Sequence, residues 1–320
     1  MQTISAYSAI INEAISALTF PAGSLEGLYS PITYALECGG KRLRPVLCLM
    51  ACEAFSGSCE RAVDVALGVE MFHNFTLLHD DVMDNSLMRR GRPSVMAEYG
   101  VNAAILSGDT MLTLATQLTM KVDDKHLRRV MDAFNRTAIE VYEGQQLDVD
   151  FEQRDDVTIP EYLDMIRLKT SVLLGYSALA GAIVGGATTA DADALYKFAE
   201  ELGIAFQIKD DLLDVYGSAD FGKPIGGDIL NNKKTYLLLS ALHSDFRQQT
   251  LEALQLTEAQ QKIAAVTAIY DKAGIRETAQ RAIEQHSQLA IRALDSISFS
   301  EPGARQAFAD LCENLINRSK

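Results

Sequence analysis

Apolar residues recur along most of the chain at spacings of three and four, which is the period of an α-helix. The pattern is strongest in five stretches, which are residues 60–84, 101–122, 124–150, 161–184 and 191–215. The strict alternation that marks β-strands is nearly absent. We therefore predict an all-α protein, a bundle of ten or more helices.

Local signals at helix boundaries agree with this prediction. Thr158 and Glu161 fit a capping box, and Thr257 with Gln260 fits a second one. The seven prolines mostly fall where helices would start or where loops would run. No Pro/Ser-rich linker and no short-period repeat divides the sequence. Residues 1–320 are therefore expected to form a single domain.

Composition narrows the class of protein. Hydrophobic residues make up 48% and charged residues 22%, which is enough for a sizeable core. The net charge of −14 repels phosphate backbones and argues against binding to nucleic acid. Five cysteines are an odd number in a long chain, so we expect core thiols rather than a disulfide framework.

The sequence also indicates in which cellular compartment the protein is expected. Residues 1–20 lack a basic start and carry Glu13 in their apolar stretch, which is typical of an amphipathic helix rather than a signal peptide. No uninterrupted run of 18 apolar residues occurs, so no membrane span is expected. We expect a reducing, cytoplasmic environment.

Two helices that are apolar on more than one face end in clusters of acids, each with the pattern DDxxD. The clusters are Asp80-Asp81-Val82-Met83-Asp84 and Asp210-Asp211-Leu212-Leu213-Asp214. Residues i and i+4 of a helix share a face, so the outer aspartates of each cluster project together. Such pairs at a helix C-terminus are unfavourable unless cations compensate. Mg²⁺ binds through one or two carboxylates together with substrate phosphates, so the doubled motif indicates magnesium.

Two other interpretations of the acids are open. Solvated acidic helix ends would explain one DDxxD motif but explain two of them poorly. A di-iron bundle is another candidate, because Glu70 and His73 fit the pattern ExxH. That site requires a second ExxH, which the sequence lacks.

Basic residues gather next to the acid motifs in spite of the acidic composition. They lie in GGKRLRP at 39–45, in RRGRP at 89–93 and in GKPIGGDILNNKKT at 222–235. Arginine matches phosphate oxygens with paired hydrogen bonds, and lysine acts as a point charge. Basic groups and metal ions together can bind a diphosphate even in an acidic protein.

In its motifs the chain strongly resembles the trans-prenyl diphosphate synthases, the family of farnesyl and geranylgeranyl diphosphate synthases. The matching segments, in the order of the family, are GGKRLRP at 39–45, HDDVMDNSLMRRGRP at 79–93, EGQQLD at 143–148, KT at 169–170, FQIKDDLLD at 206–214 and GKPIGGDILNNKKT at 222–235. The resemblance implies the all-α isoprenoid synthase fold, with a deep central cavity and usually a homodimer.

The resemblance also implies a role for each matching residue. Magnesium would be bound by Asp80, Asp84 and Asp210, with support from Asp81 and Asp214. Isopentenyl diphosphate would be bound by Lys41, Arg44, His73 and Arg90. The allylic diphosphate would be bound by Arg89, Lys169, Thr170, Gln207, Lys223 and Lys233. The expected catalytic residues are Asp80, Asp84, Arg89, Lys169, Asp210 and Lys223.

The implied reaction needs three Mg²⁺ ions per active site, with Mn²⁺ as an alternative. The allylic substrate would be dimethylallyl, geranyl or farnesyl diphosphate. Its C–O bond would break to give a carbocation, while metal ions and fixed cations stabilise the leaving diphosphate. The double bond of isopentenyl diphosphate would attack the carbocation, and the released diphosphate would accept a proton.

Product length is expected to depend on residues that precede the first DDxxD motif. In the family, the residue five positions before the first aspartate commonly forms the cavity floor; here it is Phe75, followed by the small Thr76. Phe72 or Met71 could form a deeper floor. An ideal helix turns Phe75 about 140° from Asp80, so Phe75 could instead be ordinary core.

The first motif also bears on product length. Two residues separate its aspartates, whereas many bacterial farnesyl synthases have four there. We therefore expect fifteen or twenty carbons, and the short motif favours twenty.

Three rival functions remain. A terpene cyclase would share the fold, but it usually has one DDxxD motif and no need for GGKRLRP. A non-catalytic partner subunit of a prenyl synthase would tend to have lost the aspartates. A purely structural helical protein leaves both acid motifs unexplained.

Overall fold

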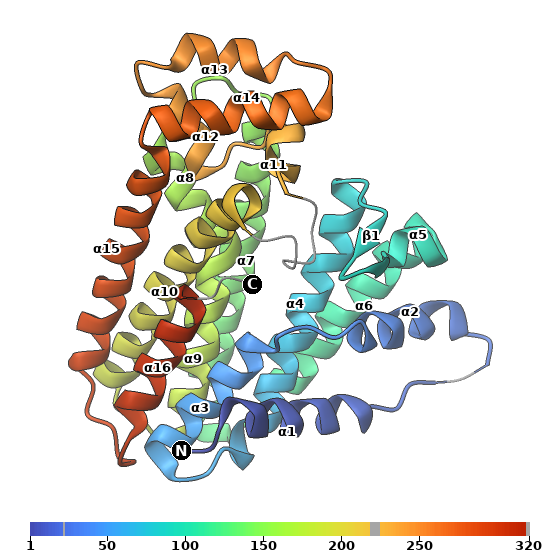
Figure 1. The fold of residues 1–320 in the computed structure, drawn as a ribbon. Coiled ribbons are helices and arrows are strands. Elements are labelled where there is room, and N and C mark those ends of the chain that lie inside the picture. The colour runs from blue at the N-terminus through green and yellow to red at the C-terminus, as the bar shows by residue number, and fades with distance from the viewer. Residues whose placement is uncertain (22, 218–224, 318–320) are drawn as a thin grey trace. The chain divides into compact units, whose positions relative to one another are not determined.

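Helices carry most of the chain in the computed structural model, which describes residues 1–21, 23–217 and 225–317 (Figure 1). Within these ranges the β-structure is one antiparallel hairpin, β1 (Met88–Arg89) and β2 (Arg92–Pro93). The prediction of an all-α protein with ten or more helices is confirmed. The five strongly periodic stretches all form helices, because periodic apolar residues stabilise a helix by giving it a face to bury.

The described chain divides into two compact units. The first unit comprises residues 1–135, 176–196 and 298–304, and the second comprises the rest of the described chain. Points of division fall within α7 (Asp124–Glu152), α9 (Val172–Gly185) and α10 (Thr189–Tyr216), and two more fall after residue 297 and after the first residue of the last helix.

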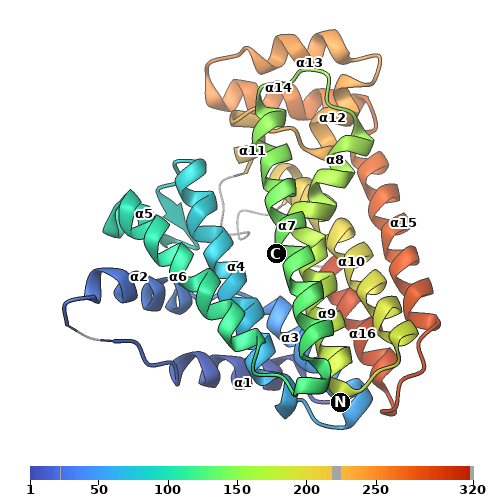
Figure 2. The same ribbon diagram turned by 180° about the vertical axis from the view of Figure 1, so that it is seen from behind.

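The first unit holds the N-terminal helices and the hairpin. Its complete helices are α1 (Ile4–Ser16), α2 (Glu26–Glu37), α3 (Leu43–Ser56), α4 (Val63–Met83), α5 (Val95–Tyr99) and α6 (Val101–Thr119), with a 3₁₀ turn at Glu60–Ala62. Figures 1 and 2 both show α4 and α6 side by side. Glycines permit this close approach, since a Cβ atom on Gly68 would lie 2.7 Å from Thr119 Oγ1 and one on Gly108 would come even closer to His79 Nε2, next to the first acid motif. The end of α4, which carries the first acid motif, is therefore fixed against α6.

The second unit holds the remaining helices. They are α8 (Ile159–Ile166), α11 (Gly227–Leu230), α12 (Tyr236–Leu242), α13 (Arg247–Leu254), α14 (Ala259–Lys272), α15 (Ile275–Asp295) and α16 (Ala304–Ile316). A π-helical turn at Arg167–Ser171 joins α8 to α9. Leu237 of α12, Val266 of α14 and Ile283 of α15 are fully buried in one apolar cluster.

The boundary predictions had mixed outcomes. The capping box of Thr158 and Glu161 is present at the start of α8. The one expected at Thr257 is wrong, because Glu258 caps α14 and accepts a hydrogen bond from the Gln261 N–H at 2.8 Å. A carboxylate near a helix N-terminus is a favoured acceptor, since it also interacts with the helix dipole. Pro31 is an exception to the expected placement of prolines, because it lies within α2.

One helical stretch, Ile159–Gly185, is long and apolar enough to span a membrane by length and composition alone. The most apolar part of this stretch is 89% buried inside the protein. A core helix of a globular protein has the same properties.

Candidate active site

The first acid motif lies at the C-terminal end of α4 and is bound by one arginine. The Arg89 guanidinium donates to Asp80 Oδ2 at 3.1 Å and to Asp81 Oδ1 at 2.6 Å. Asp81 is only 3% exposed, whereas Asp84 is exposed. Burial raises the pKa of Asp81, although the hydrogen bonds from Arg89 act in the opposite direction. The three aspartates therefore have different environments, and Asp81 is the one held inside.

The β1–β2 hairpin positions Arg89 and Arg90 differently. Arg89 pairs with Arg92 across the hairpin, so Arg90 and Gly91 form a two-residue turn. Both have positive φ, 53° at Arg90 and 76° at Gly91, as a type I′ turn requires. This conformation is unusual for arginine, and unusual backbone of this kind often occurs at functional sites.

Arg90 contacts the glycine turn that precedes α3. Its Nη1 donates to the carbonyl oxygen of Gly39. A Cβ atom on Gly40 would lie 2.8 Å from Arg90 Cζ, and Gly40 has a φ of 137°. Only glycine therefore suits this position, both for its backbone and for the approach of Arg90. The turn and the hairpin, which lie far apart in sequence, come together in the first unit.

Arg44 and His73 form a basic cluster together with Arg89 and Arg90. Arg44 Nη1 lies 3.3 Å from His73 Nε2. Arginine can only donate, so His73 Nε2 accepts and the ring is neutral. Burial lowers the pKa of Arg44 to about 10, and burial together with the neighbouring arginines lowers the pKa of His73 well below its ordinary value. Arg44 Nε is buried and has no hydrogen-bond partner among the described residues, as expected of a site that receives an anion.

The second acid motif lies at the C-terminal end of α10 in the second unit. Its middle aspartate, Asp211, is 5% exposed and accepts hydrogen bonds from the Tyr162 hydroxyl at 2.5 Å and the Tyr236 N–H at 2.9 Å. Burial raises the pKa of Asp211 to about 7. Asp214 Oδ2 accepts from the Asp228 N–H at 3.1 Å, at the start of α11. The middle aspartate is thus the buried one in both motifs.

A π-helical turn presents Lys169 and Thr170. Lys169 Nζ forms an ion pair with Asp148 Oδ2 at 2.6 Å, and Thr170 Oγ1 lies 3.5 Å from Gln207 Oε1. A Cβ atom on Gly144 would lie 2.7 Å from the Leu168 carbonyl carbon, so glycine lets α7 approach the turn. Three of the residues expected to bind the allylic diphosphate, Lys169, Thr170 and Gln207, therefore lie close together.

The other residues singled out in the sequence have varied positions. Asp148, the last residue of EGQQLD, has no expected role from the sequence, and in the structure it forms the ion pair with Lys169. Lys41 is exposed beside the glycine turn, and Lys233 follows α11. Lys223 lies outside the described residues. Glu70 pairs with Arg42 and His73 contacts Arg44, so neither side chain is arranged as a di-iron ligand.

The residues expected to set product length lie in the core of the first unit. Phe75 is 6% exposed, and its ring contacts His79 at 4.9 Å and Phe72 at 5.5 Å between centroids. Phe72 and Met71 are fully buried, while Thr76 is partly buried and donates to the His73 carbonyl oxygen at 2.8 Å. His79 Nε2 in turn lies 3.1 Å from the Ile105 carbonyl oxygen of α6. Phe75 therefore packs edge-to-face against both His79 and Phe72 on α4.

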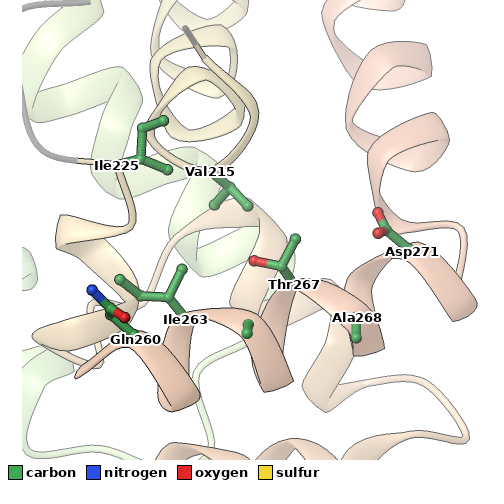
Figure 3. Close-up of a pocket in the computed structure, with 8 residues that line it drawn as sticks. Val215, Ile225, Gln260, Ile263, Thr267, Ala268 and Asp271 are labelled. Carbon is green, nitrogen blue, oxygen red and sulfur yellow. The ribbon is translucent and has the colours of Figure 1, made fainter. Parts of the chain in front are cut away.

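An open surface cavity of about 490 Å³ occurs elsewhere in the second unit (Figure 3). It lies between the end of α10 and α14, and its lining includes Val215, Ile225, Gln260, Ile263, Thr267 and Asp271. No basic residue lines it among the described residues. The cavity is therefore distinct from the clusters that could bind a diphosphate.

Comparison with known proteins gives consistent matches. A family model described as polyprenyl synthetase matches residues 26–273. A geranylgeranyl pyrophosphate synthase of Geoglobus acetivorans is 36% identical over 97% of this chain and 96% of its own length. A geranylfarnesyl diphosphate synthase of Natronomonas pharaonis is 36% identical over 97% of this chain and 95% of its own. A crystal structure of a geranylgeranyl pyrophosphate synthase has a TM-score of 0.94 at 39% identity, covering 100% of both chains.

The lowered pKa of His73 predicts how stability changes with pH. As the pH falls below about 6.5, the unfolded chain takes up a proton at this position while the folded protein does not. The free energy of unfolding should therefore fall in acid by up to about 1.4 kcal/mol per pH unit through this residue. Denaturant titrations between pH 7 and pH 5 should show a shallower loss for His73→Gln than for the natural protein. Equal slopes for the two proteins would contradict the assignment.

Proposed function

The chain belongs to the polyprenyl synthetase family, and we propose that this prenyltransferase is a short-chain trans-prenyl diphosphate synthase. It joins isopentenyl diphosphate to an allylic diphosphate and releases diphosphate. The observation that carries the proposal is the basic cluster beside the first acid motif. Arg89 there donates to Asp80 and Asp81, Arg90 follows it in the hairpin turn, and the buried Nε of Arg44 lacks a hydrogen-bond partner among the described residues.

Magnesium fits the carboxylates of both motifs. Asp80 and Asp84 lie one helical turn apart, as do Asp210 and Asp214, and all supply the oxygen ligands that Mg²⁺ prefers. No three acidic, histidine or cysteine side chains among the described residues are grouped as a ready-made metal site. Mg²⁺ needs fewer protein ligands when substrate phosphates and water complete its coordination. We propose three Mg²⁺ ions, with Mn²⁺ as an alternative, and a supporting role for Asp81 and Asp214.

The protein side chains would divide the substrate diphosphates between them. Lys41, Arg44, His73 and Arg90 would bind isopentenyl diphosphate. Arg89, Lys169, Thr170, Gln207, Lys223 and Lys233 would bind the allylic diphosphate, which is dimethylallyl, geranyl or farnesyl diphosphate.

The positive charges of the site would promote the reaction by stabilising the leaving diphosphate. When bound, the metal ions would neutralise the diphosphate as the allylic C–O bond breaks. Arg89 and Lys169 would donate charge-assisted hydrogen bonds to the same leaving group. The double bond of isopentenyl diphosphate then attacks the carbocation, and a proton passes to the released diphosphate. Apolar residues near Phe75 would keep water from the carbocation.

We propose a product of twenty carbons, with fifteen as the alternative. The short first motif supports this length, as do relatives named geranylgeranyl diphosphate synthases. Phe75 supports a short product in general, because it lies nearer to Asp80 along α4 than Phe72 and Met71 do.

A homodimer in a reducing cytoplasm completes the proposal. Val101, Ile105 and Leu106 of α6 are exposed by 46%, 39% and 58%. Exposed apolar residues gathered on neighbouring turns of a helix are typical of an interface. All five cysteines are thiols, which agrees with a reducing environment.

The acid motifs and magnesium should both be required for activity. Asp80→Asn and Asp210→Asn keep the side-chain shape but remove the charge, so each should lower turnover by about a hundredfold or more. Asp64→Asn is a matched control, since this exposed aspartate also lies on α4 and pairs only with Lys121 in the described contacts. Initial rates should be measured with magnesium and with chelator, and folding by circular dichroism. Near-normal rates in chelator or in either variant would reject the proposal.

Product length should respond to Phe75. Phe75→Ala should lengthen the product by at least one isoprene unit, because the proposed cavity floor is removed and only the deeper Phe72, against which it packs, remains. Chromatography of the products from the folded variant gives the answer. Phe151→Ala removes a buried phenylalanine from the second unit and should leave product length unchanged. An unchanged product distribution in an active Phe75→Ala protein would show that Phe75 is not the floor.

The dimer should depend on the exposed face of α6. Leu106→Asp places a charge on this face and should shift the protein from dimer to monomer in sedimentation equilibrium. Leu256→Asp, at an apolar residue 38% exposed after α13, should leave the dimer intact. A monomeric natural protein, or a Leu106→Asp protein that remains dimeric, would contradict the proposed interface.

A further inference from the structure

Arg42 differs from its basic neighbours because its side chain is buried. It is 7% exposed, although it lies between the exposed Lys41 and the start of α3. Its backbone is left-handed, with φ 48° and ψ 28°. This conformation is unfavourable for a residue with a Cβ atom, so surrounding contacts must hold it.

The guanidinium of Arg42 binds three helices at once. One Nη pairs with Glu70 of α4, the other donates to the Leu36 carbonyl oxygen of α2 at 2.6 Å, and Nε donates to Asn12 Oδ1 of α1 at 3.3 Å. The guanidinium reaches these acceptors from three nitrogens in a fixed planar fork, whereas a lysine ammonium would present its three donors from a single atom. These contacts fix the backbone between the glycine turn and α3.

Glu70 lies next to the same basic cluster. It is 2% exposed and accepts a second hydrogen bond from Asn74 Nδ2 at 3.0 Å. On α4 it precedes His73 by three residues, so both side chains lie on neighbouring positions of one face. Its negative charge raises the pKa values of Arg44 and Arg90, in opposition to burial. Glu70 thus offsets the mutual repulsion of the arginines.

We propose that Arg42 and Glu70 are positioning residues for isopentenyl diphosphate. Arg42 holds the backbone that carries Lys41 and Arg44, and Glu70 supplies the counter-charge that keeps Arg44 and Arg90 together. This inference rests on the proposed binding of isopentenyl diphosphate by Arg44. A buried ion pair with a purely structural role would change stability and leave the two substrates equally affected.

The test replaces the pair by apolar residues. The double variant Arg42→Met, Glu70→Leu keeps a similar volume, and such replacements of buried ion pairs often preserve stability. Its Michaelis constant for isopentenyl diphosphate should rise about 10- to 100-fold, since charge-assisted contacts to that substrate are misplaced. The Michaelis constant for the allylic substrate should change less than about threefold. Calorimetric titration with isopentenyl diphosphate alone should show the same weakening without turnover.

Two further variants keep the result decisive. Arg42→Lys keeps the charge but lacks the three-way contacts, so it should raise the same Michaelis constant at least about threefold even if the double variant does not fold. Glu53→Gln is the control, because this buried glutamate of α3 accepts a hydrogen bond from the Tyr7 hydroxyl at 3.0 Å. It should lower the melting temperature and leave the ratio of the two Michaelis constants unchanged.

Arg44→Ala separates the inference from the function on which it rests. If Arg44→Ala raises the Michaelis constant for isopentenyl diphosphate while folded Arg42 and Glu70 variants do not, the positioning role is wrong and the substrate site stands. If Arg44→Ala has no effect either, the assignment of this substrate to the basic cluster is wrong as well.

Discussion

Holding charge at the ends of buried helices is the constraint on which the rest of this structure depends. Each DDxxD motif meets it in the same way, by placing the middle aspartate inside and satisfying it with fixed donors. Arg89 serves Asp81, and the hydroxyl of Tyr162 with the N–H of Tyr236 serves Asp211. A buried carboxylate without such donors would be costly. The motif therefore combines an anchor to the fold with an outer pair of aspartates one helical turn apart.

The arginines of the site are also held in place, in their case through unusual backbone conformations. Arg42 and Arg90 both have left-handed conformations, with φ of 48° and 53°. Each is held by contacts to distant segments, Arg42 by Glu70 and Arg90 by the Gly39 carbonyl oxygen. Local sequence does not favour either conformation, so tertiary contacts must stabilise them. The arrangement of the arginines is a property of the packed unit rather than of the individual loops.

The difference between contacts along one helix and contacts between distant segments explains what the sequence could predict. Helix periodicity located the helices, and the i,i+4 spacing identified the paired aspartates, because both depend on neighbouring residues. Sequence gave no role to Asp148, whose partner Lys169 is 21 residues away, and did not reveal that Asp81 and Asp211 are buried. Those features depend on which segments meet in space. The cap of α14 was misplaced by one residue because Thr257 and Glu258 compete for it and local pattern alone does not rank them.

The π-helical turn at Arg167–Ser171 has a consequence for how the chain tolerates changes in length. A π turn accommodates one residue more than a regular α-helix over the same rise, as if a single residue had been inserted. Deleting one residue there would let the helix continue regularly. The helical segments before and after the turn would keep nearly the same faces, because the turn itself had absorbed the extra residue. The change would fall on the turn, so Lys169 would lose the position from which it meets Asp148. Here the number of residues in a helix matters as much as their identity.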